Sequence, residues 1–351
     1  MGRWAIACFM ERTDLRQKFI SAHGWTMAAI TALPVDASRR CYFRLAMPDG
    51  RTCLLMDAPP HAEEKFREYH LIANALCNAG LSAPEIYASD FDNGFALIED
   101  FGEDTFTRLL NNGHGTRELY LLAVDAIAQM QQRIPSDFGG VGEYTHEILM
   151  DEVLRLIDWY YPLWHGARAS ADLRAEFAGI MDNILRQLPP LKNVLVLRDF
   201  HVDNLMLLPG RHGAAQAGLL DFQDGARGNP AYDVLSLLED ARRDLDPIVM
   251  AEAWQRYAAQ INYDKHDLAL SYNILGLQRH GRITGQFIRL WIRDDKPQYL
   301  KFMPRVTAQL TAKLQAPVAA PLRTWCEKHL PMINEKWPDR PAIELKKILL
   351  N

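Results

Sequence analysis

Three polar residues in the middle of the chain could carry out metal-dependent chemistry. Asp199 and Asn204 lie five positions apart in one polar stretch, and Asp221 ends the next apolar stretch. Carboxylate and amide oxygens are the ligands that a hard cation such as Mg²⁺ prefers, and an ionised aspartate can accept the proton of a hydroxyl group. A metal beside a base suits phosphoryl transfer, because the phosphate charge needs a cation. The spacing therefore predicts Asp199 as the base and Asn204 and Asp221 as Mg²⁺ ligands.

The same residues also have alternative explanations. Asp and Asn commonly form turns and caps, and the spacing D-x-x-x-x-N is common by chance. His201 and Asp203 could join Asp221 as ligands of a metallohydrolase, but no H-E-x-x-H or H-x-x-E-H helix accompanies them. We favour the catalytic interpretation because the polar stretches lie between short apolar strands, on loops that a rigid base would hold.

The segment before these residues predicts a small antiparallel sheet. Arg40–Met47 alternates apolar and polar residues, a turn at Pro48–Gly50 follows, and Thr52–Met56 returns as the hairpin partner. Residues 62–79 form an amphipathic helix, and two further short strands surround the turn at residues 92–94. The order strand, strand, helix, strand, strand indicates one sheet with a helix packed on it.

After Gly102 the pattern becomes mainly helical. Predicted helices cover residues 104–112, 117–133, 146–165, 171–187, 231–242, 247–260, 266–292, 297–314 and 318–329, and short strands cover Val194–Leu197, Leu205–Leu208 and Ala217–Asp221. We expect the tail after Pro331 to pack loosely. The sequence predicts an α+β fold of two lobes: an extension over residues 1–13, an N-lobe over 14–100 and a helical C-lobe over 101–351.

Several motifs resemble those of a known family. The catalytic and metal residues resemble those of protein-kinase-like phosphotransferases, with Asp221 at the D-F-G position. The chain is similar to the aminoglycoside phosphotransferase family, and most similar within it to the anomeric kinases of N-acetylmuramate and N-acetylglucosamine in cell-wall recycling. The resemblance covers roughly residues 14–330. It rests on Asp36–Arg44, Met56–Pro60, Leu97–Gly102, Arg198–His201, Leu220–Asp224, Gly276–His280 and Asp295–Leu300. It implies a kinase-like fold, ATP as donor, Mg²⁺, and transfer to the C1 hydroxyl of an amino sugar.

The nucleotide site departs from the general kinase pattern. Leu197 stands where kinases have the histidine of the catalytic loop, and Leu55–Ala58 stands where V-A-I-K would supply a phosphate-binding lysine. Another cation must then hold the phosphates. Arg39 and Arg40, in the turn with Ser38, are the candidates, and solvent-facing turn charges are the alternative. We expect the backbone of residues 98–101 to contact adenine; these residues are Ile98, Glu99, Asp100 and Phe101.

Further polar residues could form the acceptor site. His201, Asp203, Gln223 and Asp224 flank the metal loops and carry groups suited to sugar hydroxyls. Arg279 could pair with a lactyl carboxylate, although Gln278, Arg279 and His280 could equally form a solvated helix face. Asp233 is interpreted as a structural anchor that accepts backbone N–H bonds from the catalytic loop, or as a helix cap or first-turn acid. The aromatic residues around Trp159–Trp164 could stack on a sugar but fit helix packing better.

Composition excludes several function classes. Of 351 residues 48% are hydrophobic and 24% charged, and the net charge is −5. This balance gives no general attraction to nucleic acid or anionic lipid, and no apolar run approaches the ~20 residues of a membrane span. The cysteines number five and none forms C-x-x-C, which favours a reducing cytoplasm.

Two alternatives to an amino-sugar kinase stay open. One is a kinase of another small acceptor, such as an aminoglycoside, choline, homoserine or a ketosamine, and the other is a nucleotide-binding pseudokinase that acts through partner contacts. The sequence does not decide the oligomeric state.

Overall fold

The structure is a computed structural model that describes residues 12–34, 40–60, 65–330, 333, 338 and 340–350. The chain divides into two compact units. Unit 1 is Met1–Val141 with Leu197–Ala226, and unit 2 is Gly142–Val196 with Arg227–Asn351. The lobe boundary predicted at about residue 100 lies inside unit 1 and stays a prediction.

Unit 1 contains a five-stranded sheet in which all neighbours are antiparallel, in the order β1-β2-β3-β5-β4. Its strands are β1 (Ala29–Ala32), β2 (Cys41–Ala46), β3 (Thr52–Asp57), β4 (Ile86–Asp90) and β5 (Phe95–Ile98). The predicted β2–β3 hairpin is confirmed, with Gly50 in the turn at φ +88°, a conformation that glycine adopts without strain.

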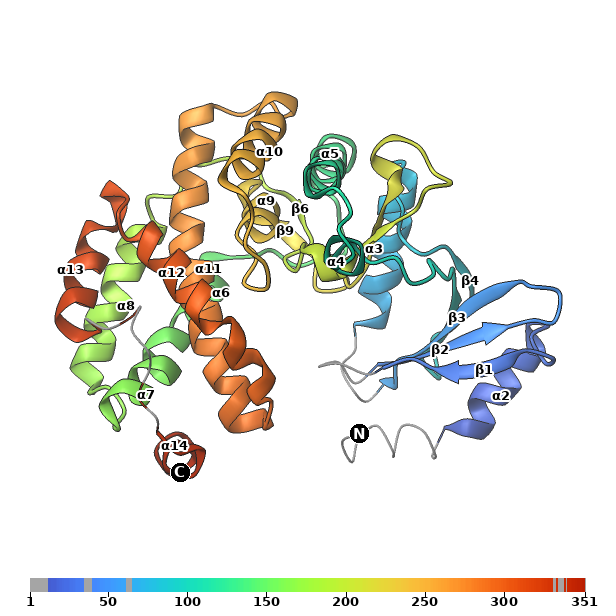
Figure 1. Cartoon of the computed structure of the whole chain (residues 1–351), viewed down its shortest axis with the longest axis horizontal. Coiled ribbons are helices and arrows are strands. Elements are labelled where there is room, and N and C mark those ends of the chain that lie inside the picture. Colours follow the sequence, from blue (N-terminus) through green and yellow to red (C-terminus); the bar gives the residue numbers. More distant parts are fainter. Residues whose placement is uncertain are drawn as a thin grey trace. The chain divides into compact units, whose positions relative to one another are not determined.

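Helix α2 (Thr13–Ala22) covers one face of this sheet, as Figure 1 shows in dark blue. Because side chains alternate along a strand, Phe43 and Leu45 of β2 point to this face and are buried with Phe19 and Ile20 of α2. Arg44 lies between them in sequence and therefore belongs to the opposite face of the sheet. The face toward α2 thus makes one apolar core, and the face that carries Arg44 also holds the buried apolar residues Met56, Ala96 and Ile98.

The described residues of unit 1 also form three helices and a short hairpin. The helices are α3 (Phe66–Asn78), α4 (Phe106–Asn111) and α5 (Thr116–Arg133). The hairpin pairs β7 (Leu205–Leu207) with β8 (Ala217–Leu219), and the 3₁₀ turns η3 (Val202–Asn204) and η4 (Gly213–Gln216) flank and connect these strands.

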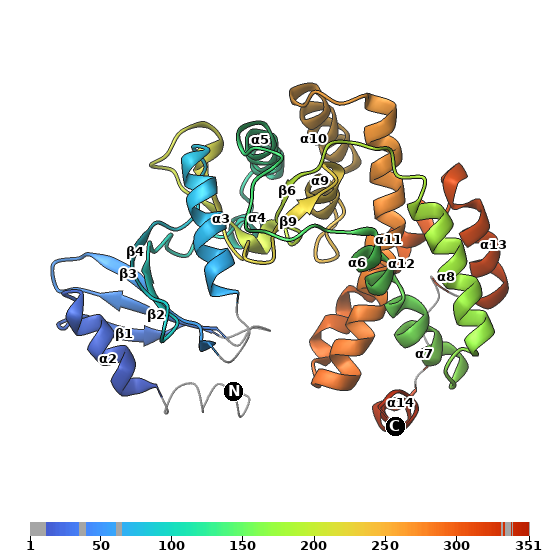
Figure 2. The same ribbon diagram turned by 180° about the vertical axis from the view of Figure 1, so that it is seen from behind.

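Unit 2 is mainly helical. Its elements are α6 (His146–Val153), the π-helical segment η2 (Leu156–Tyr160), α7 (Tyr161–His165), α8 (Ala171–Leu185), the strand pair β6 (Val194–Val196) and β9 (Ala226–Gly228), α9 (Ala231–Leu238), α10 (Pro247–Gln260), α11 (Lys265–Asp294), η5 (Pro297–Phe302), α12 (Met303–Lys313), η6 (Pro317–Ala319), α13 (Ala320–His329) and α14 (Ala342–Leu349). The long helix α11 packs against α6, α9 and α12 (Figure 2).

The single helix predicted over residues 146–165 is wrong, because a π-helical segment interrupts it. Gly285 of α11 lies so close to this segment that a Cβ atom there would be 2.0 Å from the carbonyl oxygen of Arg155. A π turn is rare and occurs mostly as a short bulge within an α-helix, where it can kink the helix. Tyr160, in this segment, is fully buried, which supports the helix-packing interpretation of the nearby aromatic residues.

Two further differences from expectation concern the two ends of the chain. Helix α2 and strand β1 were not predicted, since β1 has four exposed residues and no burial alternation. The loosely packed tail is wrong for residues 342–349, because α14 buries Leu345 and Leu349. Among the described residues, no helix combines the length and the apolar character that crossing a membrane requires.

Candidate active site

The β7–β8 hairpin brings two of the predicted metal ligands to one end of unit 1. Leu205 pairs with Leu219, so Asn204 and Leu220 lie side by side, and the Leu220 amide donates to the Asn204 carbonyl oxygen over 3.0 Å. Asp221 is the next residue. The side-chain amide of Asn204 donates to the backbone oxygen of Asp199 over 2.9 Å. The structure therefore joins the loops that carry Asp199, Asn204 and Asp221 through hydrogen bonds.

Both loops contain a residue in the left-handed backbone region without being glycine. Asp221 has φ +57° and Arg198 has φ +70°. Such conformations cost about 1–3 kcal/mol and persist where the surroundings hold them, often at functional sites. Phe222 supplies part of this hold, because its ring is fully buried and stacks on Tyr69 of α3 with centroids 4.8 Å apart.

A cluster of side chains surrounds the Asp221 carboxylate. Arg40, only 4% exposed, donates from Nη2 to Asp221 Oδ1 over 3.1 Å and from Nη1 to Gln223 Oε1 over 2.8 Å. Gln223 Nε2 donates to the same Asp221 oxygen over 2.9 Å and to Asp224 over 3.3 Å. Lys65, directly before α3, lies 2.7 Å from the Asp224 carboxylate. Two cations therefore contact the two carboxylates of this loop.

The segment after β5 is held by a second arginine. Arg44 donates to both carboxylate oxygens of Asp100 over 2.7 and 3.0 Å, to Glu103 over 3.1 Å and to the carbonyl of Gly102 over 3.0 Å. The hydrogen bonds that Arg44 donates to Asp100 raise the pKa of Arg44, although partial desolvation opposes this. Residues 99–103 are thus fixed to strand β2, as an adenine-binding backbone would require.

The connection between β7 and β8 contacts the other side chains of this segment. Arg211 Nη2 lies 2.5 Å from Glu99, and its guanidinium lies 5.2 Å from the centre of the Phe101 ring. Gly218 of β8 lies against this ring, since a Cβ atom there would be 2.8 Å from it.

An acid occupies the region where kinases carry the phosphate-binding lysine. Asp57, at the end of β3, is fully buried and contacts Arg12 over 2.9 Å and Arg16 over 3.0 Å. Burial raises the pKa of Asp57, and the two arginines oppose this shift. Asp57 therefore attaches Arg12 and helix α2 to the end of strand β3.

The comparison with family models matches residues 29–269 to the "Phosphotransferase enzyme family". This chain belongs to the phosphotransferase enzyme family.

Relatives of known name agree with this membership. The phosphotransferase is 32% identical to the N-acetylmuramate/N-acetylglucosamine kinase of Caulobacter vibrioides, over 92% of this chain and 98% of that protein. It is 33% identical to the kinase of the same name from Pseudomonas aeruginosa, over 90% of this chain and 94% of that one.

Solved structures show the fold. An amicoumacin kinase in complex with AMP-PNP, Ca²⁺ and Ami matches with a TM-score of 0.60 at 16% identity, over 91% of this chain and 97% of that one. A choline/ethanolamine kinase family protein from Mesorhizobium loti matches with a TM-score of 0.60 at 13% identity, over 92% and 99%. The predicted kinase-like α+β fold is confirmed, and the chain is a kinase-type phosphotransferase that uses ATP.

The donor atoms of the phosphotransferase fit a hard cation. Asn204 uses its amide nitrogen toward Asp199, which leaves the amide oxygen as the donor for a metal. The Asp221 side chain is 46% exposed, so it is accessible from solution. Oxygen donors of these two types are the ones that Mg²⁺ takes in proteins.

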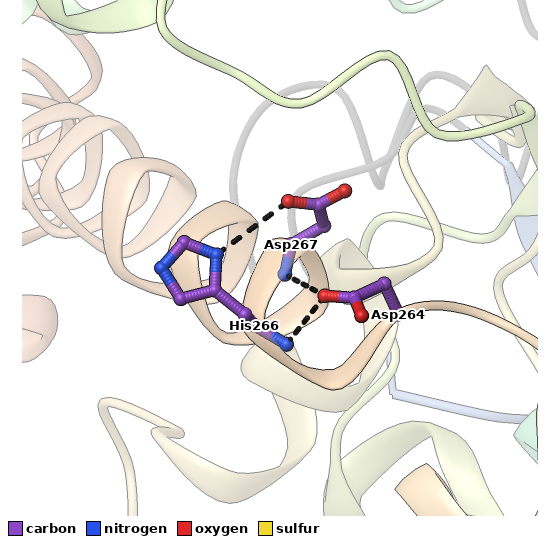
Figure 3. A group of neighbouring side chains, drawn as sticks. All are labelled: Asp264, His266 and Asp267. Carbon is purple, nitrogen blue, oxygen red and sulfur yellow. Dashed lines mark hydrogen bonds and ion pairs between the residues drawn. The ribbon is translucent and has the colours of Figure 1, made fainter.

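A second group of possible metal ligands in the described residues has a structural explanation. Asp264, His266 and Asp267 lie together at the start of α11 (Figure 3). The Asp264 carboxylate accepts the backbone N–H bonds of His266 over 2.9 Å and Asp267 over 3.0 Å. This is helix capping, and we assign no metal there.

Some predicted acceptor residues lie beside the catalytic loop. His201 is buried, with Nε2 3.4 Å from the side-chain nitrogen of Asn204. Asp203 is exposed and accepts a hydrogen bond from Thr107 of α4. Ser38 and Arg39 lie outside the described residues.

The other predicted residues lie in unit 2. Asp233 is fully buried in the first turn of α9, whose N-cap is Pro230; it is thus a first-turn acid, and the N-cap alternative is wrong. Arg279 is 2% exposed and donates to Ser236 over 2.7 Å. Because Gln278 and His280 are also buried, the solvated helix face considered above is wrong.

Sequence reasoning missed Lys65, Arg44 and the pair Arg12 and Arg16. Lys65 has φ +44° and sits at the start of a predicted helix, where a lysine carries no special signal. Arg44 is one of the polar residues that alternate with apolar residues along its strand, and this alternation does not identify the partners of its guanidinium group.

Proposed function

We propose that this phosphotransferase transfers the γ-phosphate of ATP to the anomeric C1 hydroxyl of N-acetylmuramate or N-acetylglucosamine, with Mg²⁺ as cofactor. One observation carries the proposal: four proteins named N-acetylmuramate/N-acetylglucosamine kinase match this chain at 30–33% identity over 79–92% of its length. The hydrogen-bonded arrangement of Asp199, Asn204 and Asp221 in unit 1 supports it.

The proposed roles follow from the chemistry of each group. Asp199 orients the acceptor hydroxyl and accepts its proton. Asn204 and Asp221 hold Mg²⁺, which when bound neutralises charge on the phosphate oxygens. Arg40, with Ser38 and Arg39, contacts the phosphates in place of the missing lysine. The backbone of Ile98–Phe101 contacts adenine, and Arg44 holds this segment through the Asp100 carboxylate.

The proposed acceptor contacts use groups near the catalytic loop and one in unit 2. His201, Asp203, Gln223 and Asp224 have donors and acceptors that match sugar hydroxyls. Arg279 would pair with the lactyl carboxylate of muramate. For Arg279 the pairing requires partial release from Ser236, to which it now donates.

A cytoplasmic location is part of the same proposal. Cys41, Cys53, Cys77 and Cys326 are free thiols in the structure. Free thiols without disulfides are typical of a reducing compartment, where ATP is also available.

The test replaces Asp199 with Asn. ADP release is measured for both amino sugars and for a panel of aminoglycosides, choline, homoserine and ketosamines, and ³¹P NMR identifies the phosphorylated position. We expect wild-type product at C1 and a loss of about 10²–10⁴-fold in kcat for the variant, which is the usual contribution of general-base catalysis. Asp244→Asn is the control, because Asp244 forms an exposed pair with Arg305. Near-normal kcat in Asp199→Asn would reject the assigned base, and nucleotide binding without turnover on any acceptor would favour a pseudokinase.

A further inference from the structure

Arg40 occupies an unusual position for a residue expected to contact phosphate. Its guanidinium is 4% exposed and is fixed at two points, on Gln223 Oε1 at 2.8 Å and on Asp221 Oδ1 at 3.1 Å. Arg40 lies 181 residues from Asp221 in sequence, so this contact is a product of the fold. A buried arginine paired in this way neutralises the carboxylate that a metal would need.

A metal ion would compete with two hydrogen-bond donors for one oxygen atom of Asp221. Asp221 Oδ1 accepts both Arg40 Nη2 and Gln223 Nε2. A metal ion and these two N–H donors seek the same lone pairs, and the positive charge of Arg40 also opposes a cation at this place. A metal bound through Asp221 therefore weakens the hold on Arg40.

The phosphates need a cation that the usual strand position does not provide. Asp57, at the end of β3, is fully buried and already paired with Arg12 and Arg16. A guanidinium presents a planar fork of donors that matches phosphate oxygens. Arg40 therefore has a second class of partner, the phosphates of a nucleotide, once Asp221 no longer holds it.

We propose that Arg40 is an exchangeable cation that couples metal binding to nucleotide binding. It neutralises Asp221 when the site lacks metal and nucleotide, and it transfers to the nucleotide phosphates when the metal takes Asp221. This rests on the proposed function, because it requires Asp221 to bind a metal and Arg40 to reach a phosphate. The coupling is reciprocal by thermodynamic necessity, so each ligand favours the other.

The test measures binding and needs no turnover. Mn²⁺, which prefers the same oxygen ligands as Mg²⁺, is titrated by electron paramagnetic resonance, and ADP is titrated by calorimetry with and without Mn²⁺. In Arg40→Gln we expect Mn²⁺ alone to bind more tightly than in wild type, because its competitor is gone. ADP should bind more weakly, and the coupling between the two should fall by about tenfold, within the usual range of coupling energies. Arg51→Gln, which removes an exposed arginine paired with Asp49, should match wild type.

A second variant tests the exchange by changing the carboxylate of Asp221 in place of Arg40. Asp221→Asn replaces the carboxylate partner of Arg40 with an amide at a side chain that is 46% exposed, and thermal unfolding of the variant checks that its fold is kept. Metal-free ADP should then bind several-fold more tightly than to wild type, roughly fivefold on the scale of such couplings. Asp224→Asn is the matched control, since it removes a neighbouring carboxylate that pairs with Lys65 instead, and it should change metal-free ADP binding much less.

The outcomes separate this inference from the proposed function. Weaker binding of both ligands in Arg40→Gln, or unchanged coupling, would overturn the exchange while leaving an ATP-dependent kinase intact. An equal gain in Asp221→Asn and Asp224→Asn would overturn it in favour of general charge effects. Failure of the wild-type protein to bind either Mn²⁺ or ADP would overturn the proposed function itself, and the exchange with it.

Discussion

Arg16 of α2 and Asp57 of β3 form a buried ion pair in which Nη1 and Oδ2 are 3.0 Å apart. Arg12 adds a second contact to the other carboxylate oxygen over 2.9 Å, and the two guanidinium groups lie over the rings of Phe43 and Phe95, at 4.6 and 4.4 Å from their centres. Helix α2 is thus attached to the sheet by charge as well as by its apolar face. Asp57, within the segment Leu55–Ala58 that stands where V-A-I-K is expected, serves here to hold helix α2.

Removing the charge of Asp57 should destabilise unit 1. Asp57→Asn leaves two arginines beside a neutral side chain, and breaking a buried ion pair typically costs about 3–5 kcal/mol. We expect a loss of this order in the free energy of unfolding, measured by urea denaturation. Asp49→Asn, at an exposed turn where Asp49 pairs with Arg51, should show no measurable loss. Equal stability of the two variants would mean that Asp57 does not anchor α2.

Loss of Arg44 should affect nucleotide binding more than the chemical step. Its guanidinium makes four hydrogen bonds to Asp100, Glu103 and the Gly102 carbonyl, and it touches no group proposed to react. Arg44→Gln should raise KM for ATP by about tenfold or more, since hydrogen bonds to charged groups are worth about 1.5–3 kcal/mol each, while kcat changes less than threefold on that scale. Steady-state kinetics with varied ATP distinguishes this from a catalytic role. A fall in kcat with unchanged KM would contradict it.

The contact between α11 and the π-helical segment predicts that alanine in place of Gly285 destabilises the protein. The same substitution at Gly179, another helical glycine, should stabilise it. A Cβ atom at Gly285 would lie 2.0 Å from the Arg155 carbonyl oxygen and 2.7 Å from the Leu156 nitrogen, and backbone atoms cannot move aside cheaply. Gly285→Ala should therefore cost about 3 kcal/mol, at the upper end for overpacking. Gly179 in α8 has nothing within 4 Å of its Cβ position, so Gly179→Ala should gain about 1 kcal/mol through helix propensity. Thermal unfolding of both variants is the measurement, and a stabilised Gly285→Ala would contradict the close contact.

The parts of the fold that follow a local pattern were predictable from sequence. Alternation along Cys41–Ala46 defined β2, and the turn at Asp49-Gly50 defined its partner. Strand β1 has no such pattern, because all four residues are exposed. The interruption of the helix over residues 146–165 depends on Gly285, 130 residues away from Arg155, and no local signal marks it.

In the candidate site, too, some features were predictable from the sequence and others were not. The spacing of Asp199, Asn204 and Asp221 is visible in the sequence because it resembles the D-x-x-x-x-N and D-F-G arrangement of kinase-like phosphotransferases. The partners of Asp221 are not visible. Arg40 was a candidate for the phosphates, but its contact with Asp221 arises only in the folded chain, and Lys65 carried no signal until its ion pair with Asp224 was seen.

The buried carboxylate of Glu239 predicts how unit 2 responds to acid. Glu239 contacts His280 and Lys313, each over 2.6 Å. Burial would raise the pKa of Glu239, but the His280 hydrogen bond and the Lys313 charge outweigh it and lower the pKa to about 2. When the pKa of a carboxylate is lower in the folded state than in the unfolded state, its charge stabilises the fold at pH values above the unfolded-state pKa. This stabilisation is lost as the pH falls toward the folded-state pKa. The contribution should therefore be complete at pH 7 and decline between about pH 5 and pH 2.

Glu239→Gln isolates this contribution. At pH 7 the variant should be less stable than wild type by about 3 kcal/mol, because Lys313 loses its buried partner. The difference should shrink as the pH is lowered from 5 to 3, since wild-type Glu239 then approaches the pH at which it is protonated. Urea unfolding at several pH values measures the difference, and Asp244→Asn, at the exposed pair with Arg305, provides the control for surface charge. A difference that stays constant from pH 7 to pH 3 would show that the charge of Glu239 does not contribute, and that only its shape matters to the packing around Lys313.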